Sequence, residues 1–229
     1  MFHDKELLLF DLDGTLIDSV PDLAKALNAT LRELDLPTYD EATVRTWIGN
    51  GAAVLVKRGL VGRREIDREP EGVLFRRAME IFLKRYAAVL NDATGLYPEV
   101  KETLQKLEDQ GYRMAIVTNK PSQFVAPILK NLAIESHFDY IVGGEDLPRK
   151  KPDPLPLLHS CDVLGCKPEA AVMIGDSSND ILAARAAGIP SVVVAYGYSA
   201  DREVRDLGAD AVVERFGEIL DFFERSHRE

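Results

Sequence analysis

The sequence predicts an α/β protein with a doubly wound, Rossmann-like parallel sheet that is interrupted by an inserted α-helical cap domain. Short apolar runs alternate with amphipathic helical patterns over most of the chain, whereas residues 20–91 offer helical patterns and no convincing strand. The 229 residues suffice for a core domain with a smaller companion. We therefore expect a core formed by residues 1–16 and 93–229 and a cap formed by residues 17–92.

Six short apolar runs, each bounded by polar or turn-forming residues, have the length and composition of buried strands. They span residues 7–10, 113–117, 140–142, 171–174, 192–195 and 211–213. Helical patterns lie between the later runs, and several begin near a Pro or end at a Gly. They span residues 99–110, 122–131, 155–164 and 180–187. This alternation of strands and helices predicts a parallel sheet.

The predicted cap contains two amphipathic helices, over residues 22–34 and 72–90. Between them, residues 62–70 are highly charged and are expected to form a solvated loop.

Composition excludes several classes of partner. The chain has 28 Lys and Arg against 38 Asp and Glu, and its formal net charge of −10 opposes non-specific binding to nucleic acid or anionic lipid. No apolar run approaches the roughly 20 residues that span a bilayer, and no signal-peptide pattern is present. Cys161 and Cys166 form neither a disulfide framework nor a zinc site. We expect a cytoplasmic monomer or homodimer without nucleic-acid or membrane partners.

Polar side chains follow several of the predicted strands. Because ligands of open parallel sheets bind beyond the carboxyl ends of the strands, these side chains are candidates for a site. The candidates are Asp11 and Asp13 after the first strand, Thr118 and Asn119 after the second, Lys151 in the basic segment after the third, and Asp176 and Asp180 after the fourth.

The aspartates favour a magnesium site. Asp11 and Asp13 are two residues apart and share a face, and Gly14 allows a sharp turn. A divalent cation would offset the repulsion between such carboxylates, and oxygen-only donors favour Mg²⁺ over zinc. Asp176 and Asp180 could complete the set.

A phosphate fits beside this metal, with its oxygens bound by Mg²⁺, Thr118 and Lys151. The nucleophile would then be an aspartate, because an ionised carboxylate attacks phosphorus without prior deprotonation.

Structural alternatives exist for each motif. The Asp-x-Asp-Gly-Thr segment could be an Asp-stabilised turn, and Thr118-Asn119 and the segment around Asp176 could cap helices. Chemistry alone does not decide whether Lys150 or Lys151 points inward. Arg45, in the predicted cap, could recognise a substrate carboxylate or form a surface ion pair.

Four segments occur in the order that is typical of the haloacid dehalogenase superfamily, which this sequence resembles over nearly its whole length. They are residues 10–19 (FDLDGTLIDS), 117–120 (VTNK), 151–154 (KPDP) and 175–180 (GDSSND). Within that family, residues 46–51 (TWIGNG), 118–121 (TNKP) and 125–127 (VAP) look most like those of bacterial phosphoglycolate phosphatases.

The resemblance implies roles for these residues. Asp11 would form an aspartyl-phosphate, and Asp13 would protonate the leaving group and then activate water. Asp11, the Asp13 carbonyl and Asp176 would hold Mg²⁺, with Asp180 supporting directly or through water. Thr118, Asn119 and Lys151 would bind the phosphate or the rest of the substrate, and Thr118 and Lys151 would contact the phosphoryl oxygens.

The resemblance also implies an activity, the Mg²⁺-dependent hydrolysis of a small phosphorylated substrate, 2-phosphoglycolate. A cap that closes over the site would select the substrate through residues 45–51. The alternatives are a phosphatase of the same fold for another phosphomonoester or pyrophosphate, a phosphomutase, and a non-catalytic scaffold. Family members that displace halide lack the second aspartate, so Asp13 favours phosphoryl transfer.

Overall fold

The computed structural model describes residues 2, 4–198, 206 and 208–223. The chain divides into two compact units. The core unit comprises Met1–Ile17 and Leu96–Glu229, and the helical unit comprises Asp18–Gly95.

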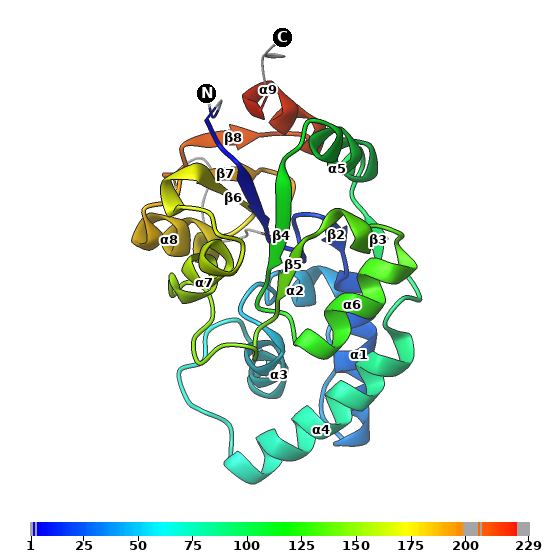
Figure 1. Cartoon of the computed structure of the whole chain (residues 1–229). Coiled ribbons are helices and arrows are strands. Elements are labelled where there is room, and N and C mark those ends of the chain that lie inside the picture. Colours follow the sequence, from blue (N-terminus) through cyan, green and yellow to red (C-terminus); the bar gives the residue numbers. More distant parts are fainter. Residues whose placement is uncertain (1, 3, 199–205, 207, 224–229) are drawn as a thin grey trace. The chain divides into compact units, whose positions relative to one another are not determined.

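The core unit contains a six-stranded parallel sheet in the order β5-β4-β1-β6-β7-β8, and the prediction of a parallel α/β fold is confirmed (Figure 1). All six predicted strands are present; β6 is one residue longer than predicted, and β7 is shifted by one residue towards the N-terminus. The strands are β1 (Leu7–Phe10), β4 (Arg113–Val117), β5 (Tyr140–Val142), β6 (Ala171–Gly175), β7 (Ser191–Val194) and β8 (Ala211–Val213).

In the part of the core unit that the structure describes, five α-helices and three short 3₁₀ helices connect and flank the strands. The four helices predicted from the sequence are present, with ends that differ by no more than two residues. The helices are α5 (Val100–Asp109), α6 (Ser122–Asn131), α7 (Leu155–Val163), α8 (Ser178–Ala187), α9 (Leu220–Phe223), η1 (Glu135–His137), η2 (Pro168–Ala170) and η4 (Phe216–Ile219).

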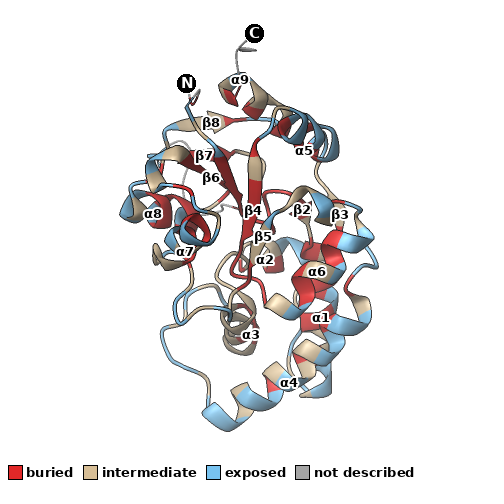
Figure 2. Cartoon of the chain, viewed as in Figure 1, coloured by how far each residue is buried: buried red, intermediate tan, exposed pale blue. Residues whose placement is uncertain are grey.

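The central strand β1 is buried on both faces, as expected for a parallel sheet covered by helices on its two sides (Figure 2). Leu7 and Leu9 pack in one hydrophobic cluster with Leu157 of α7 and Ala184 of α8. On the opposite face, the ring of Phe10 lies 6.0 Å from that of Phe216 in η4, which α5 contacts. Because both faces of the sheet are covered, polar side chains are left at the ends of the strands, along one edge of the sheet.

The helical unit contains α1 (Val20–Glu33), α2 (Glu41–Arg45), α3 (Ala52–Val61) and α4 (Gly72–Val89). The longest two, α1 and α4, pack against each other and correspond to the predicted helices. Phe82 and Tyr86 of α4 are buried and stack one turn apart. Residues 62–70 contain no helix or strand and are largely exposed, as expected from their charge.

A buried carboxylate holds together the two ends of the helical unit. Asp22, in the first turn of α1, accepts hydrogen bonds from the backbone N–H of Ala93 at 3.0 Å and of Thr94 at 2.8 Å. The Thr94 hydroxyl also donates to Asp22, at 2.6 Å. The short strands β2 (Ile17–Asp18) and β3 (Gly95–Leu96) pair where the chain passes between the units.

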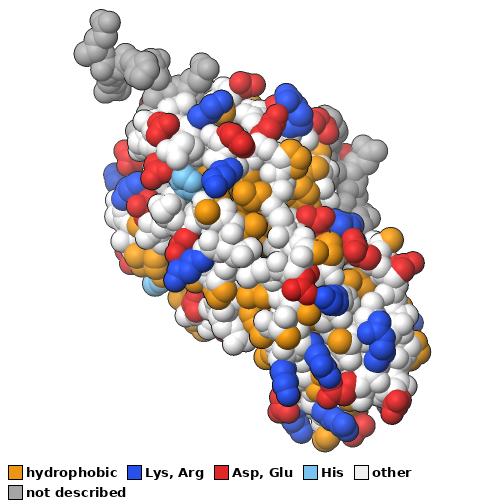
Figure 3. Space-filling view, turned by 90° about the vertical axis from the view of Figure 1, so that its right-hand side faces the viewer, with side chains coloured by type: hydrophobic (Ala, Val, Ile, Leu, Met, Phe, Trp, Pro, Cys, Tyr) orange, Lys and Arg blue, Asp and Glu red, His pale blue; other side chains and the backbone are white. Residues whose placement is uncertain are grey.

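Surface charge is mixed on the face drawn in Figure 3, where Lys and Arg side chains lie among Asp and Glu side chains. This pattern, with the net charge of −10, gives no continuous basic surface on that face. Within the described part of the chain, every helix is too short or too polar to cross a bilayer.

Candidate active site

The carboxyl edge of the sheet gathers the candidate residues. Asp11 directly follows β1, Thr118 directly follows β4, and Asp176 directly follows β6. Because β1 pairs in parallel with both β4 and β6, these positions lie at one edge of the sheet. The edge is therefore built by neighbouring strands.

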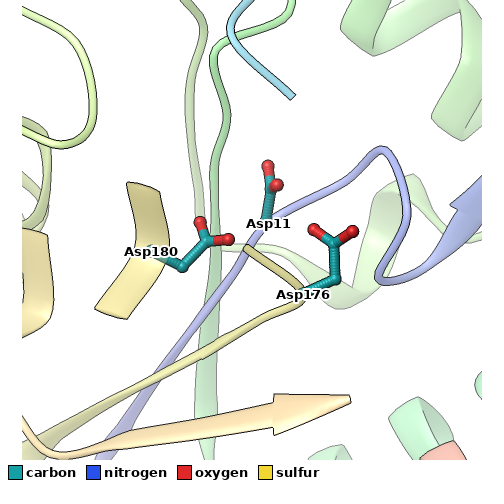
Figure 4. A group of neighbouring side chains, drawn as sticks. All are labelled: Asp11, Asp176 and Asp180. Atoms are coloured by element: carbon teal, nitrogen blue, oxygen red, sulfur yellow. The ribbon is translucent and has the colours of Figure 1, made fainter. Parts of the chain in front are cut away.

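Three buried aspartates converge at this edge (Figure 4). One carboxylate oxygen from each of Asp11, Asp176 and Asp180 lies within 4.8 Å of the others. Two oxygens on opposite sides of a magnesium ion are about 4.2 Å apart, so a small inward movement would bring this set to octahedral distances. The donors are all oxygen atoms, and they fit a hard divalent cation.

Lys151 pairs with two of these carboxylates. Its Nζ lies 3.0 Å from Asp11 Oδ1 and donates to Asp180 Oδ1 at 2.6 Å, and the side chain is 2% exposed. The side-chain amide of Asn119 donates to the backbone carbonyl of Lys151 at 3.0 Å. The structure thus selects Lys151 rather than Lys150 as the inward-pointing lysine.

The position of Asp180 follows from the start of α8. Its Oδ2 accepts hydrogen bonds from the backbone N–H of Ser177 at 3.0 Å and from the Ser177 hydroxyl at 2.6 Å. This is half of a capping box, which the sequence Ser-x-x-Asp favours. The other oxygen, Oδ1, is left facing Lys151, and helix capping and site formation use the same side chain.

The electrostatics of the cluster favour a cation. When all are ionised, three carboxylates against one ammonium leave two negative charges in excess. The pKa of Asp11 is raised from 3.8 to about 6, because burial and the charges of Asp180 and Asp13 outweigh the opposing charge of Lys151. Burial and the charges of Asp180 and Asp11 raise the pKa of Asp176 well above its ordinary value. A bound divalent cation would favour the ionised forms of both carboxyls.

A second buried ion pair lies beside this cluster. The Nζ of Lys120 donates to both oxygens of Asp13, at 2.9 and 3.2 Å, and the lysine side chain is 2% exposed. Thr118, which is also buried, accepts a hydrogen bond from the Lys120 backbone N–H at 3.2 Å. No role for Lys120 was predicted from the sequence, although a lysine three residues beyond a strand end was the available signal.

Known proteins resemble this chain over nearly its whole length. A family model described as haloacid dehalogenase-like hydrolase matches residues 8–194. The chain belongs to this family. A curated relative from Colwellia psychrerythraea named phosphoglycolate phosphatase is 46% identical over 218 residues, 95% of this chain and 96% of the relative.

Solved structures of the family share the fold. The crystal structure of a predicted phosphoglycolate phosphatase from Haemophilus somnus 129pt has a TM-score of 0.89 at 40% identity and covers 96% of this chain and 98% of that one. A mutant of CbbY from Rhodobacter sphaeroides, crystallised with xylulose-(1,5)bisphosphate, has a TM-score of 0.78 at 25% identity. That match covers 93% of this chain and 96% of the other.

In this family member, the segment after β7 supports the cluster in a way the sequence analysis missed. The backbone N–H of Tyr198 donates to Asp176 Oδ2 at 2.6 Å. A Cβ on Gly197 would lie 2.2 Å from the Asp176 Cβ, and a Cβ on Gly14 would lie 2.3 Å from Asp176 Oδ2. Asp176 is therefore enclosed by two backbone segments that only glycine allows so close.

Two tyrosine hydroxyls fix the loop that follows Asp13. Tyr196 donates to the carbonyl of Thr15 at 2.7 Å, and Tyr198 donates to the carbonyl of Ile17 at 3.3 Å. Gly14, with a φ of +88°, makes the turn at the start of this loop. These contacts join the Asp13 loop to the segment that holds Asp176.

Arg45 belongs to the helical unit of the family member. It is the last residue of α2, and its guanidinium donates to Asp18 at 2.9 Å and to Glu41 at 3.4 Å. Seven of the eight predicted site residues thus lie in the core unit, and Arg45 lies in the other unit. Its role in binding a substrate stays a prediction.

Proposed function

We propose that the protein hydrolyses 2-phosphoglycolate to glycolate and phosphate, with Mg²⁺ as the metal and an aspartyl-phosphate as the intermediate. The observation that carries this proposal is the convergence of three buried aspartates and Lys151 at the sheet edge. Eight curated relatives at 42–46% identity are named phosphoglycolate phosphatase, one of them as probable, and this supports the choice of substrate.

The metal would be held by the Asp11 carboxylate, the Asp13 backbone carbonyl and Asp176. Asp180 would support it directly or through water, since its oxygens already accept from Lys151 and Ser177. When bound, Mg²⁺ supplies charge that screens the Asp11 carboxylate from the dianionic phosphate. The rest of the chemistry falls to side chains of the core unit.

The first half-reaction transfers the phosphoryl group. A carboxylate oxygen of Asp11 attacks phosphorus, and the bond between phosphorus and the ester oxygen breaks. Asp13 donates a proton to the leaving oxygen, which departs as the glycolate hydroxyl. Lys151 and Thr118 bind the phosphoryl oxygens. Because Lys151 is buried, its charge interacts more strongly with these oxygens than it would in water.

The second half-reaction regenerates the enzyme. Asp13, now ionised, takes a proton from a water molecule whose oxygen attacks the phosphorus of the Asp11 phosphate. The bond between phosphorus and the Asp11 oxygen breaks, and inorganic phosphate leaves. One carboxyl therefore serves as acid and then as base, without net consumption of protons by the enzyme.

The test is kcat/KM for phosphate release with 2-phosphoglycolate, sugar phosphates, nucleotides, pyridoxal phosphate and pyrophosphate, with and without Mg²⁺. We expect a preference of about 100-fold or more for 2-phosphoglycolate, near 2.7 kcal/mol of differential transition-state binding. The bisphosphate held by the CbbY mutant makes a sugar phosphate the main alternative, and a preference for that class would replace the proposed substrate.

Two further results would separate mechanism from substrate. Labelled phosphate should be trapped on Asp11 and be absent from Asp11→Asn. A label on another residue would refute the mechanism, and release of phosphate equal to that of Asp11→Asn would favour a scaffold. A phosphomutase would return the label to a sugar instead of to water.

A further inference from the structure

Lys120 is a buried cation that the proposed mechanism does not use. Its ammonium lies within hydrogen-bond distance of both oxygens of Asp13, the proposed acid and base. Its backbone is held by two neighbours. The N–H donates to the Thr118 hydroxyl at 3.2 Å, and the carbonyl accepts from the Gly144 N–H at 2.8 Å. The charge is therefore fixed in place before any ligand arrives.

We propose that Lys120 binds the carboxylate of 2-phosphoglycolate and is a specificity-determining residue of the core unit. The inference rests on the proposed function, because it names the group that recognises that substrate. It places carboxylate recognition at the end of β4, on the same edge of the sheet as the phosphate site.

The distances permit this contact. Asp13 must lie about 2.6–3.2 Å from the ester oxygen to give it a proton. Lys120 lies 2.9 Å from the nearer oxygen of Asp13, so its ammonium is at most about 6 Å from the ester oxygen. In 2-phosphoglycolate a carboxylate oxygen lies roughly 3 Å from the ester oxygen, from standard bond lengths. The remaining distance of about 3 Å is that of a charge-assisted hydrogen bond.

The chemistry of the ammonium also fits. It has three donors, and its position next to Asp13 lets it contact Asp13 and a substrate carboxylate together. Lys151, the other buried lysine of the edge, faces Asp11 and Asp180 beside the phosphate site. Lys120 therefore lies on the leaving-group side, where the carboxylate of the substrate must be.

Arg45 fits this role less well. Its guanidinium pairs with both Asp18 and Glu41, so the group of three carries an excess negative charge that disfavours an anionic ligand. Its side chain is 36% exposed, and solvent weakens a charge contact there relative to one made by the buried Lys120.

The experiment compares two substrates that differ in one group. Ethyl phosphate has the same ester as 2-phosphoglycolate but carries a methyl group in place of the carboxylate. We expect Lys120→Met to lower the ratio of kcat/KM for 2-phosphoglycolate to that for ethyl phosphate by about 30-fold or more, the loss of a charge-assisted hydrogen bond. Lys130→Met, an exposed lysine of α6, is the matched control and should keep the wild-type ratio.

Lys120→Gln and Lys120→Arg give an independent reading should the Met variant fail to fold. Glutamine keeps a hydrogen-bond donor but not the charge, so Lys120→Gln should lower the ratio of kcat/KM for 2-phosphoglycolate to that for ethyl phosphate nearly as much as Lys120→Met does. Arginine keeps the charge, so Lys120→Arg should lower this ratio less. Circular dichroism and thermal unfolding establish that each variant is folded before its kinetics are compared.

Several outcomes would overturn the proposal. A parallel loss of activity on both substrates would mean that Lys120 only positions Asp13, because that role does not depend on the substrate carboxylate. A ratio lowered by Arg45→Met and not by the Lys120 variants would place recognition in the helical unit. A wild-type enzyme without preference for 2-phosphoglycolate would instead refute the proposed function, before any variant is made.

Discussion

Metal binding should stabilise the protein more at pH 7.5 than at pH 5, and the pKa of Asp11 gives the magnitude. This pKa is raised from 3.8 to about 6, with burial as the largest cause. At about 1.36 kcal/mol per pKa unit, the difference corresponds to about 3 kcal/mol. In the folded protein the Asp11 carboxyl stays protonated up to about pH 6, whereas in the unfolded chain it loses its proton near pH 3.8. Between these values the metal-free protein loses stability as pH rises, and the full cost is present above about pH 6.

The proposed Mg²⁺ would need the ionised carboxyl, and its binding would remove this cost. The assay is thermal unfolding at pH 5 and pH 7.5, each in EDTA and in saturating Mg²⁺. We expect the metal to raise Tm more at pH 7.5, with a difference between the two pH values of up to roughly 6–12 °C, at about 2–4 °C per kcal/mol. Comparing the EDTA and Mg²⁺ samples at the same pH cancels the contribution to stability of groups that titrate far from the site.

The matched control is Asp11→Asn, which cannot ionise at this position. Its metal-free sample should lack the loss of stability that the Asp11 carboxyl causes between pH 3.8 and about 6. An equal rise in Tm at pH 5 and pH 7.5 in the wild-type protein would refute the reasoning, because the metal would then not compete with protons at the cluster.

Two further substitutions test other contacts of the structure. Gly14→Ala would place a Cβ 2.3 Å from Asp176 Oδ2. We therefore expect the concentration of Mg²⁺ that gives half-maximal activity to rise at least about tenfold. The control Gly165→Ala, which has open space around the added Cβ, should leave that concentration unchanged. Asp22→Asn replaces one carboxylate oxygen, which accepts from the backbone N–H groups of Ala93 and Thr94, by an NH₂ group that can only donate. We expect this change to lower the free energy of unfolding, measured by denaturant titration, by about 1–3 kcal/mol. An unchanged midpoint would show that this buried carboxylate does not hold the ends of the helical unit.

The sequence predicted the sheet well because buried parallel strands are short, apolar and bounded by turns. It missed α2 and α3 of the helical unit. The first has only five residues, and the second includes Gly59, which lowers helix propensity. The structure explains this glycine, because a Cβ there would lie 2.7 Å from Leu27 Cδ1 of α1. Close packing between helices has no local signal in a sequence.

The candidate site likewise contains residues that the sequence predicted and contacts that it did not. Asp11, Thr118 and Asp176 directly follow strands, and local pattern was enough to place them at one edge. The N–H of Tyr198 on Asp176 and the ammonium of Lys120 on Asp13 were not predicted. A backbone donor has no side-chain signature, and the lysine pairs with a residue 107 positions away, so both depend on the folded chain.

The contact between Asp22 and Thr94 joins positions that are 72 residues apart. The chain therefore enters and leaves the helical unit at neighbouring points, and the intervening residues form a loop closed at its base. Inserted domains are tolerated where their two ends lie close together, since the host fold need not stretch to accommodate them. A helical unit with this closed base could be exchanged for one from a relative, with Asp22 and Thr94 as the junctions, and the transplant would test which unit selects the substrate.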